Sequence, residues 1–153
     1  MNQDLERKYI AFISYRHLPL HMEVATAIHR RIEHYIIPKG LRKNGQKKLG
    51  YVFRDQDELP LVGTLSDNIQ YALDNSEYLI VVCTPETSES LWCLQEIDYF
   101  LQHHDRDHVL AILADGSPAE AFPKELVEVR DENGEVISRA EPLAANIAAE
   151  NSL

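Results

Sequence analysis

The chain has 153 residues, 44% of them apolar and 26% charged, which predicts a single soluble domain with a substantial core. Its formal net charge of -10 disfavours nucleic acid as a partner, because phosphate contacts require a basic surface. The N-terminus lacks an apolar segment, and no apolar run approaches the length of a membrane span. We therefore expect a cytoplasmic protein whose domain makes no membrane contact.

Apolar periodicity predicts strands and helices that alternate along the chain. Nearly all-apolar runs at residues 9–14, 51–54, 79–83 and 109–113 are typical of buried strands. Between them, helical spacing of apolar residues predicts helices at 24–36, at 65–73, and around Trp92 to about His104. This alternation indicates a parallel sheet covered on both faces. The predicted fold is α/β, a flavodoxin-like three-layer sandwich with a five-stranded parallel sheet of order 2-1-3-4-5.

The C-terminal part of the sequence follows a different pattern. Asn133-Gly134 lies between β-forming residues, which predicts a hairpin with a type I′ turn. The tail, residues 141–153, has a helical pattern without an end signal. We expect that the chain was cut from a longer protein and that residues 1–153 form one domain, with a hairpin and tail at 130–153.

Two other features concern individual side chains. Cys83 and Cys93 have no partner at metal-ligand spacing, so we expect free thiols in a reducing compartment. Basic residues gather without any intervening acid in the segment KGLRKNGQKK, at Lys39, Arg42, Lys43, Lys47 and Lys48. This segment fits a solvated loop, although it could also form a local patch for a small anion.

The predicted sheet order locates a ligand site. In such sheets, ligands bind beyond the carboxyl ends of the strands, where the strand order reverses. Strands 1 and 3 flank that point. The residues expected there follow strand 1 (Tyr15, Arg16 and His17), strand 2 (55–65) and strand 3 (from Thr84).

Glu96 has an unusual position on the helix in SESLWCLQEIDYF. Helical geometry assigns five residues to the core face: Cys93, Leu94, Ile97, Phe100 and Leu101. A second stripe contains Trp92, Glu96, Tyr99 and His103. Glu96 is therefore expected at the helix edge beside an indole, where its pKa could be raised or its carboxyl aimed into a cleft. The residues alone leave both a structural and a catalytic role open.

Several familiar sites are absent or incomplete in the sequence. There is no G-x-G-x-x-G and no G-x-x-x-x-G-K-[ST] motif. The acidic pair that receiver domains carry after strand 1 is replaced by Ser14-Tyr15-Arg16, and Asp55-Gln56-Asp57 lacks the context of a phosphatase motif. His104 and His108 are separated by a segment that ends the helix, so we predict no metal site there.

Several stretches in order and register resemble a TIR (Toll/interleukin-1 receptor) domain: YIAFISYRH, VFRDQDELPLVG, LSDNIQYALDNSEYLIVVCTP and SESLWCLQEI. The resemblance covers residues 9–129. The middle of this region is particularly similar to bacterial and plant TIR domains. It implies an NAD-consuming enzyme in which Glu96, four residues after Trp92, is catalytic. NAD⁺ would be the substrate and no cofactor or metal would be needed. The DQDELPLVG loop would serve homotypic TIR–TIR assembly.

The resemblance also implies substrate-binding positions, namely Tyr15, Arg16, Asp55, Gly63, Leu65, Ser90 and Trp92. Arg16 would hold the carboxamide end or a phosphate, or would instead pair with Asp55. Leu65 replaces an aromatic residue that packs on the ligand in some relatives. Ser90 would contact the ligand or serve the first helical turn, and Trp92 would line the pocket or fill the core.

The main hypothesis is a self-assembling NAD⁺ nucleosidase or cyclase in bacterial defence, giving nicotinamide with ADP-ribose or a cyclic isomer. One alternative is a non-enzymatic scaffold that acts through TIR–TIR contacts. Another is a nucleotide sensor without turnover. The presence of Glu96 favours the enzyme, because a pure scaffold has no need of that residue.

Overall fold

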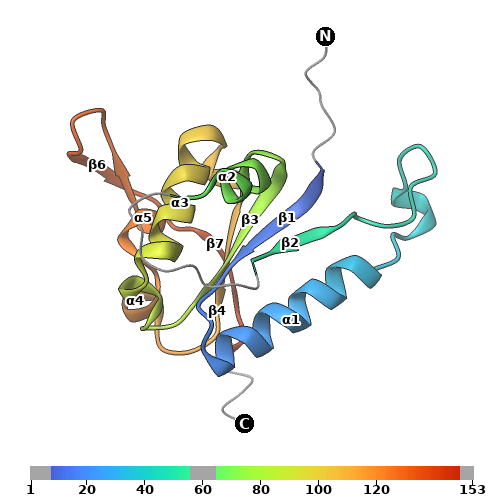
Figure 1. Ribbon diagram of the computed structural model, residues 1–153, viewed down its shortest axis with the longest axis horizontal. Coiled ribbons are helices and arrows are strands. Elements are labelled where there is room, and N and C mark those ends of the chain that lie inside the picture. The colour runs from blue at the N-terminus through green and yellow to red at the C-terminus, as the bar shows by residue number, and fades with distance from the viewer. Residues whose placement is uncertain (1–7, 56–64, 149–153) are drawn as a thin grey trace.

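The computed structural model describes residues 8–55 and 65–148. Strands and helices alternate along most of the chain (Figure 1). The strands are β1 (Tyr9–Ser14), β2 (Val52–Arg54), β3 (Ser76–Cys83), β4 (Val109–Leu113), β5 (Glu128–Arg130), β6 (Val136–Arg139) and β7 (Leu143–Asn146). The helices are α1 (Pro19–His34), α2 (Asp67–Asp74), α3 (Leu91–His103), α4 (Pro118–Ala121) and α5 (Lys124–Val127), with 3-10 turns η1 (Lys39–Leu41), η2 (Thr87–Glu89) and η3 (Arg106–His108).

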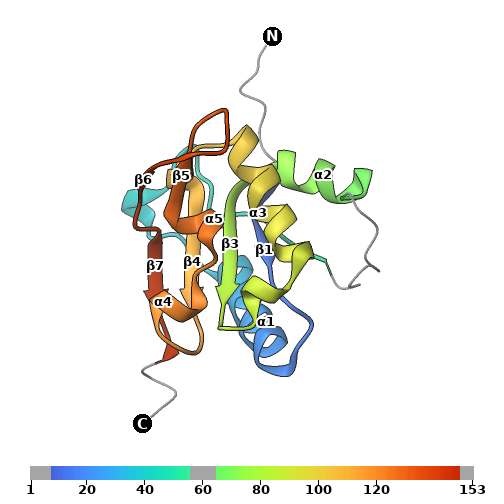
Figure 2. The same cartoon turned by 90° about the vertical axis from the view of Figure 1, so that its left-hand side faces the viewer.

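Five strands form one parallel sheet in the order β2-β1-β3-β4-β7, which confirms the predicted arrangement. Figure 2 shows β7, β4, β3 and β1 side by side in this order. Alternate residues of each strand enter different cores. In β1, Ala11 and Ile13 pack with α1, whereas Phe12 packs with α2 and α3 on the opposite face. The molecule therefore has the three layers expected from the sequence.

Helix α1 begins and ends earlier than predicted. It starts at Pro19, because proline has a suitable φ and its missing N–H is harmless in the first turn. It ends at His34, and Tyr35 is already extended. Among the described helices, none has the length and apolar character required to cross a membrane.

The predicted helical pattern of the tail is wrong for Leu143–Asn146. These residues form β7, the fifth strand of the sheet, which pairs in parallel with β4 from Leu110↔Leu143 to Leu113↔Asn146. Alanine and leucine favour helix, but the free edge of β4 offers backbone partners that outweigh this weak preference. The side chains of β7 remain exposed, so no apolar alternation marked the strand in the sequence.

The predicted C-terminal hairpin is present as the antiparallel pair β5–β6, but the predicted type I′ turn is wrong. Type I′ requires positive φ at both central residues, and only Gly134 has it, with φ 83°. The Asp131 carboxylate accepts the N–H groups of Asn133 at 2.8 Å and Glu135 at 3.0 Å. This aspartate therefore organises a longer loop around Gly134.

Candidate functional site

The candidate site lies at the carboxyl edge of the sheet, beside the first turns of α3. The neighbouring strands β1 and β3 end there, at Ser14 and Cys83. Ser90 begins the following helix, because its Oγ accepts the Cys93 N–H at 3.2 Å as an N-cap. These elements bring the predicted residues after strand 1 close to α3, at the edge where doubly wound sheets bind ligands.

Glu96 is buried at this edge, with 1% of its surface exposed. Its Oε1 accepts a hydrogen bond from the Ser14 hydroxyl at 2.7 Å. Its Oε2 is buried without a hydrogen-bond partner of ordinary geometry among residues 8–55 and 65–148. Burial raises the pKa of Glu96 well above the 4.5 of a free glutamate. The hydrogen bonds from Ser14 and Trp92 lower the pKa and so partly offset the effect of burial, whereas the negative charge of Asp55 raises it further. A carboxyl group so perturbed at a ligand-binding edge is a functional candidate.

The sequence prediction placed Glu96 at the helix edge, outside the core face. The structure instead turns Glu96 into the buried face of α3, with Cys93, Ile97 and Phe100. Leu94, predicted to be core, is only partly buried. The physical reason is the polar end of β1, where the Ser14 hydroxyl provides a partner that lets a carboxyl group face the sheet.

Ser14 is the contact that sequence reasoning missed. Its position carried a signal, because residues two apart on a strand point to the same face. Phe12 lies in the core between the sheet and α3, so Ser14 had to point toward the same helix. A buried hydroxyl at the end of that face predicts a polar partner on α3.

Tyr15 and His17 hold Asp55 at the end of β2. The Tyr15 hydroxyl donates to the Asp55 carbonyl at 2.8 Å, and His17 Nε2 lies 3.1 Å from the same oxygen. The two rings stack at a centroid distance of 4.9 Å. Tyr15 is buried, with 5% of its surface exposed, and the Arg54 guanidinium carbon also lies over its ring, 5.9 Å from the ring centroid. The pair ties together the chain segments that leave β1 and β2.

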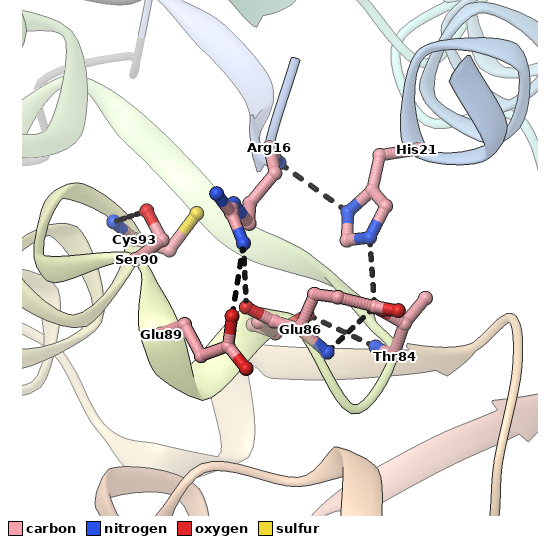
Figure 3. Close-up of polar contacts among 8 residues, drawn as sticks. Arg16, His21, Thr84, Glu86, Glu89, Ser90 and Cys93 are labelled. Carbon is pink, nitrogen blue, oxygen red and sulfur yellow. Dashed lines mark hydrogen bonds and ion pairs between the residues drawn. The ribbon is translucent and has the colours of Figure 1, made fainter. Parts of the chain in front are cut away.

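Arg16 lies in a second polar cluster, with His21, Thr84, Glu86 and Glu89 (Figure 3). Its Nη1 donates to the Glu86 carbonyl at 3.1 Å and lies 3.8 Å from Glu89 Oε1. Its Nε is buried without a hydrogen-bond partner within the described parts of the chain. The ion pair seen for Arg16 is thus with Glu89, whereas the sequence had suggested Asp55. The guanidinium keeps donor capacity for an anionic ligand.

His21 organises this cluster, and sequence reasoning had not singled it out. It is 2% exposed on α1; its Nδ1 accepts the Arg16 backbone N–H at 3.4 Å, and its Nε2 lies 2.8 Å from Thr84 Oγ1. Since Nδ1 is an acceptor, we assign the proton to Nε2, which donates to Thr84. Burial lowers the pKa of His21, which fits this neutral form.

The other predicted residues lie around these two clusters. Leu65 is buried in the apolar core, and the partly buried Trp92 packs against the same core. Ser90 caps α3, which is the structural alternative considered from the sequence. Gly63 lies outside the described residues, as does most of the DQDELPLVG loop.

The histidines near the end of α3 have structural contacts. His104 stacks on Phe100 with ring centroids 3.8 Å apart, and His108 Nδ1 lies 2.8 Å from the Glu77 carbonyl. Within residues 8–55 and 65–148, no group of three or more His, Cys, Asp or Glu side chains is arranged to hold a metal ion. Cys83 and Cys93 are both buried and form no disulfide, and burial raises the pKa of Cys83 to about 12.

The depressed pKa of His21 predicts a loss of stability in acid. Below about pH 6.5 the unfolded chain binds a proton at this histidine that the folded protein resists, so folding weakens as the pH falls further. We expect His21→Asn to lose part of this pH dependence, measured as urea unfolding free energy between pH 7.5 and 5.5. The exposed His34 on the same helix supplies the control variant His34→Asn, which should keep the wild-type slope.

Comparisons with known proteins identify relatives of this chain. A family model described as "TIR domain" matches residues 11–134. An NAD(+) hydrolase of Actinoplanes sp., ApTIR, is 33% identical over 112 residues, which are 71% of this chain and 14% of that protein. The TIR domains of the activated Roq1 resistosome, solved recognising the pathogen effector XopQ, superpose with a TM-score of 0.52. That match has 22% identity and covers 72% of this chain and 60% of the other.

Proposed function

We propose that this chain, which belongs to the TIR domain family, cleaves the bond between nicotinamide and ribose in NAD⁺, with Glu96 as its catalytic carboxylate. The chain spans only 14% of the length of its hydrolase relative, so the activity is proposed for this domain and not for a whole protein. The observation that carries the proposal is the buried Glu96 carboxyl at the carboxyl edge of the sheet.

The chemistry requires only one carboxylate. The pyridinium ring of NAD⁺ is already cationic, so nicotinamide leaves as a neutral molecule and needs no general acid, unlike the leaving group of an ordinary glycoside. A negative Glu96 stabilises the positive charge that develops on the ribose as the bond breaks, and it can accept hydrogen bonds from the ribose hydroxyls. Water or the adenine of the same molecule then captures the ribose carbon, giving ADP-ribose or a cyclic isomer. NAD⁺ is the substrate, and the proposal includes no separate cofactor.

The protonation of Glu96 links substrate binding to catalysis. In the isolated chain, burial favours the neutral carboxylic acid. A cationic nicotinamide ring placed beside it favours the carboxylate, because an opposite charge lowers the pKa of an acid. Binding of NAD⁺ thereby produces the negative charge that the transition state uses.

The burial of Glu96 also supports self-assembly as part of the activity. With 1% exposure, its carboxyl meets a substrate only after neighbouring side chains move. We propose that contact between copies of the chain drives this movement. We also propose that the activity serves bacterial defence. Association would then raise the rate per copy as protein concentration increases.

The experiment is nicotinamide release from NAD⁺, followed by chromatography over a range of protein concentrations. Release with a rate per copy that rises with concentration supports enzyme and assembly together. A rate per copy that does not change with concentration would reject the dependence on assembly but would still support the enzymatic activity. No release, even from protein clustered on a surface, favours a non-catalytic TIR scaffold, for which Glu96 and Ser14 would be a buried structural pair. The second product peak separates hydrolysis from cyclisation.

The raised pKa of Glu96 predicts how activity depends on pH. If the carboxylate is the active form, kcat/KM should increase with pH and level off at a pH well above 4.5. Ser14→Ala removes a hydrogen bond that favours the charged form, so its midpoint should lie at higher pH than that of the wild type. Rates measured from pH 5 to 9 test this, and an unchanged midpoint in Ser14→Ala would contradict the role given to the hydroxyl.

A further inference from the structure

The basic segment of the sequence forms a projecting hairpin, residues 36–48, which we call the basic hairpin. Ile36 and Lys48 form an antiparallel bridge, and the Ile37 N–H donates to the Lys47 carbonyl at 2.7 Å. Asn44 and Gly45 have φ 54° and 75°, the positive values that a type I′ turn requires. The segment predicted as a solvated loop therefore has a defined hairpin geometry.

This hairpin combines positive charge with exposed apolar side chains. It carries five basic residues and no acid, while the remainder of the chain carries all 25 acidic and only ten of the 15 basic residues. None of its four lysines forms an ion pair within the described part of the chain. Leu41 and the adjoining Tyr51, 71% and 73% exposed, are the most exposed large apolar side chains among the described residues. Such a surface is suited to a negatively charged protein partner.

A second projecting hairpin, residues 128–141, carries the opposite charge; we call it the acidic hairpin. It contains five acidic and two basic residues. Arg130 and Arg139 both pair with Glu128. Glu132 and Glu135 at its tip form no ion pair within the described residues.

The acidic hairpin also exposes apolar side chains, and it is only partly packed against the rest of the molecule. Val136, Ile137 and Leu143 on or beside it are exposed by 46%, 62% and 63%. All side chains of β6 are exposed, whereas Glu128 and Val129 of β5 are partly buried, so the ribbon is covered only along part of β5. An isolated ribbon of two strands is marginally stable in water. Contact with a partner would cover the apolar side chains and stabilise it.

The two hairpins project from opposite ends of the long axis of the molecule (Figure 1). We propose that the basic hairpin of one copy docks on the acidic hairpin of a second copy. Opposite charges favour the approach, and the exposed apolar residues at both ends supply the buried contact. A second copy fits better than nucleic acid or an anionic membrane, because the strongly acidic remainder of the chain would be repelled by either.

The proposal rests on the self-association included in the proposed function and specifies its surfaces. Because the two surfaces differ and lie at opposite ends, a dimer leaves one hairpin of each kind free. The contact is heterologous, so association should continue beyond a dimer into open chains of increasing length. Screening by salt should weaken it, since the charged side chains are solvent-exposed.

The test is a charge exchange measured by sedimentation and light scattering. K43E/K47E lowers the net charge of the basic hairpin from +5 to +1, and E132K/E135K changes that of the acidic hairpin from -3 to +1. We expect each variant alone to lower the association constant roughly tenfold or more. In an equimolar mixture, the unaltered basic hairpin of E132K/E135K can dock on the unaltered acidic hairpin of K43E/K47E, so mixed dimers should form with the wild-type affinity. R30E/R31E on α1 changes the net charge by the same amount as K43E/K47E and should leave association unchanged.

Several results would overturn the proposal. The first is a wild-type protein that stays monomeric at all concentrations. The second is an equal loss of association in R30E/R31E. The third is a mixture of the two charge variants in which no mixed dimer forms. Binding of anionic vesicles or of duplex RNA that is lost in K43E/K47E, with association intact, would assign the basic hairpin to a membrane or nucleic acid. Nicotinamide release by chains clustered on a surface is measured separately. A failure of this docking contact is thereby distinguished from a failure of the proposed activity.

Discussion

Glu96→Gln is expected to abolish nicotinamide release while leaving the fold intact. Glutamine keeps the size of the side chain and an oxygen that can accept the Ser14 hydroxyl proton at the 2.7 Å contact. It cannot become negative, so the charge that stabilises the ribose cation is lost. Removing a single preorganised electrostatic group typically lowers kcat by about 100- to 1000-fold. Single-turnover assays at saturating NAD⁺ measure this loss at the chemical step.

The same substitution should preserve or raise stability. The folded protein keeps a proton on Glu96 at pH values where the unfolded chain has released it, so the wild type loses stability as the pH rises above 4.5. Glutamine has no charge to bury and escapes this loss. We expect a Tm at pH 8 equal to or above that of the wild type. This combination, an inactive but no less stable protein, is typical of a functional residue held in an unfavourable environment.

Asp98→Asn provides the matched control for Glu96→Gln. Asp98 lies on the same helix but is exposed, so the same change from carboxylate to amide there should alter neither rate nor Tm. Unfolding of Glu96→Gln would indicate a structural pair with Ser14. Full activity of a folded Glu96→Gln would reject Glu96 as the catalytic group.

The sheet could be predicted because its central strands are buried on both faces. A strand such as β3, with Leu79 to Cys83 almost completely inaccessible, leaves a continuous apolar run in the sequence. The edge strand β7 has exposed side chains and leaves no such run. Its position depends on backbone pairing with β4, a nonlocal contact that side-chain periodicity does not encode.

The candidate site was only partly predictable for a related reason. Glu96 was identified through its spacing from Trp92 and through the family resemblance. Both signals can be read from the sequence without knowledge of the packing. The depth of its burial depends on Ser14, 82 residues away in the sequence, and on the rotation of α3 that their hydrogen bond favours. His21 was missed because a histidine on a predicted helix has no distinctive signal until Thr84 is found opposite it.

Arg16→Ala is expected to raise the KM for NAD⁺ by about 10- to 100-fold, with a smaller effect on kcat. We propose that its guanidinium binds the diphosphate of the substrate. Hydrogen bonds between charged groups contribute about 1.5–3 kcal/mol, which corresponds to this range of affinity. In the structure Arg16 donates to one carbonyl, and its ion pair with Glu89 spans 3.8 Å to a side chain that is 73% exposed. Such an exposed pair contributes little to stability, so the change should leave the fold intact.

Inhibition by ADP-ribose separates the possible roles of Arg16, because this product retains the diphosphate and has lost nicotinamide. If Arg16 binds the diphosphate, Arg16→Ala should weaken ADP-ribose inhibition by the same factor as it raises KM. If Arg16 holds the carboxamide, inhibition should be unchanged while KM rises. Glu89→Gln is the control for the ion pair alone: it frees the guanidinium without removing it. We therefore expect an unchanged or lower KM in Glu89→Gln, and an increase matching that of Arg16→Ala would instead assign Arg16 a structural role.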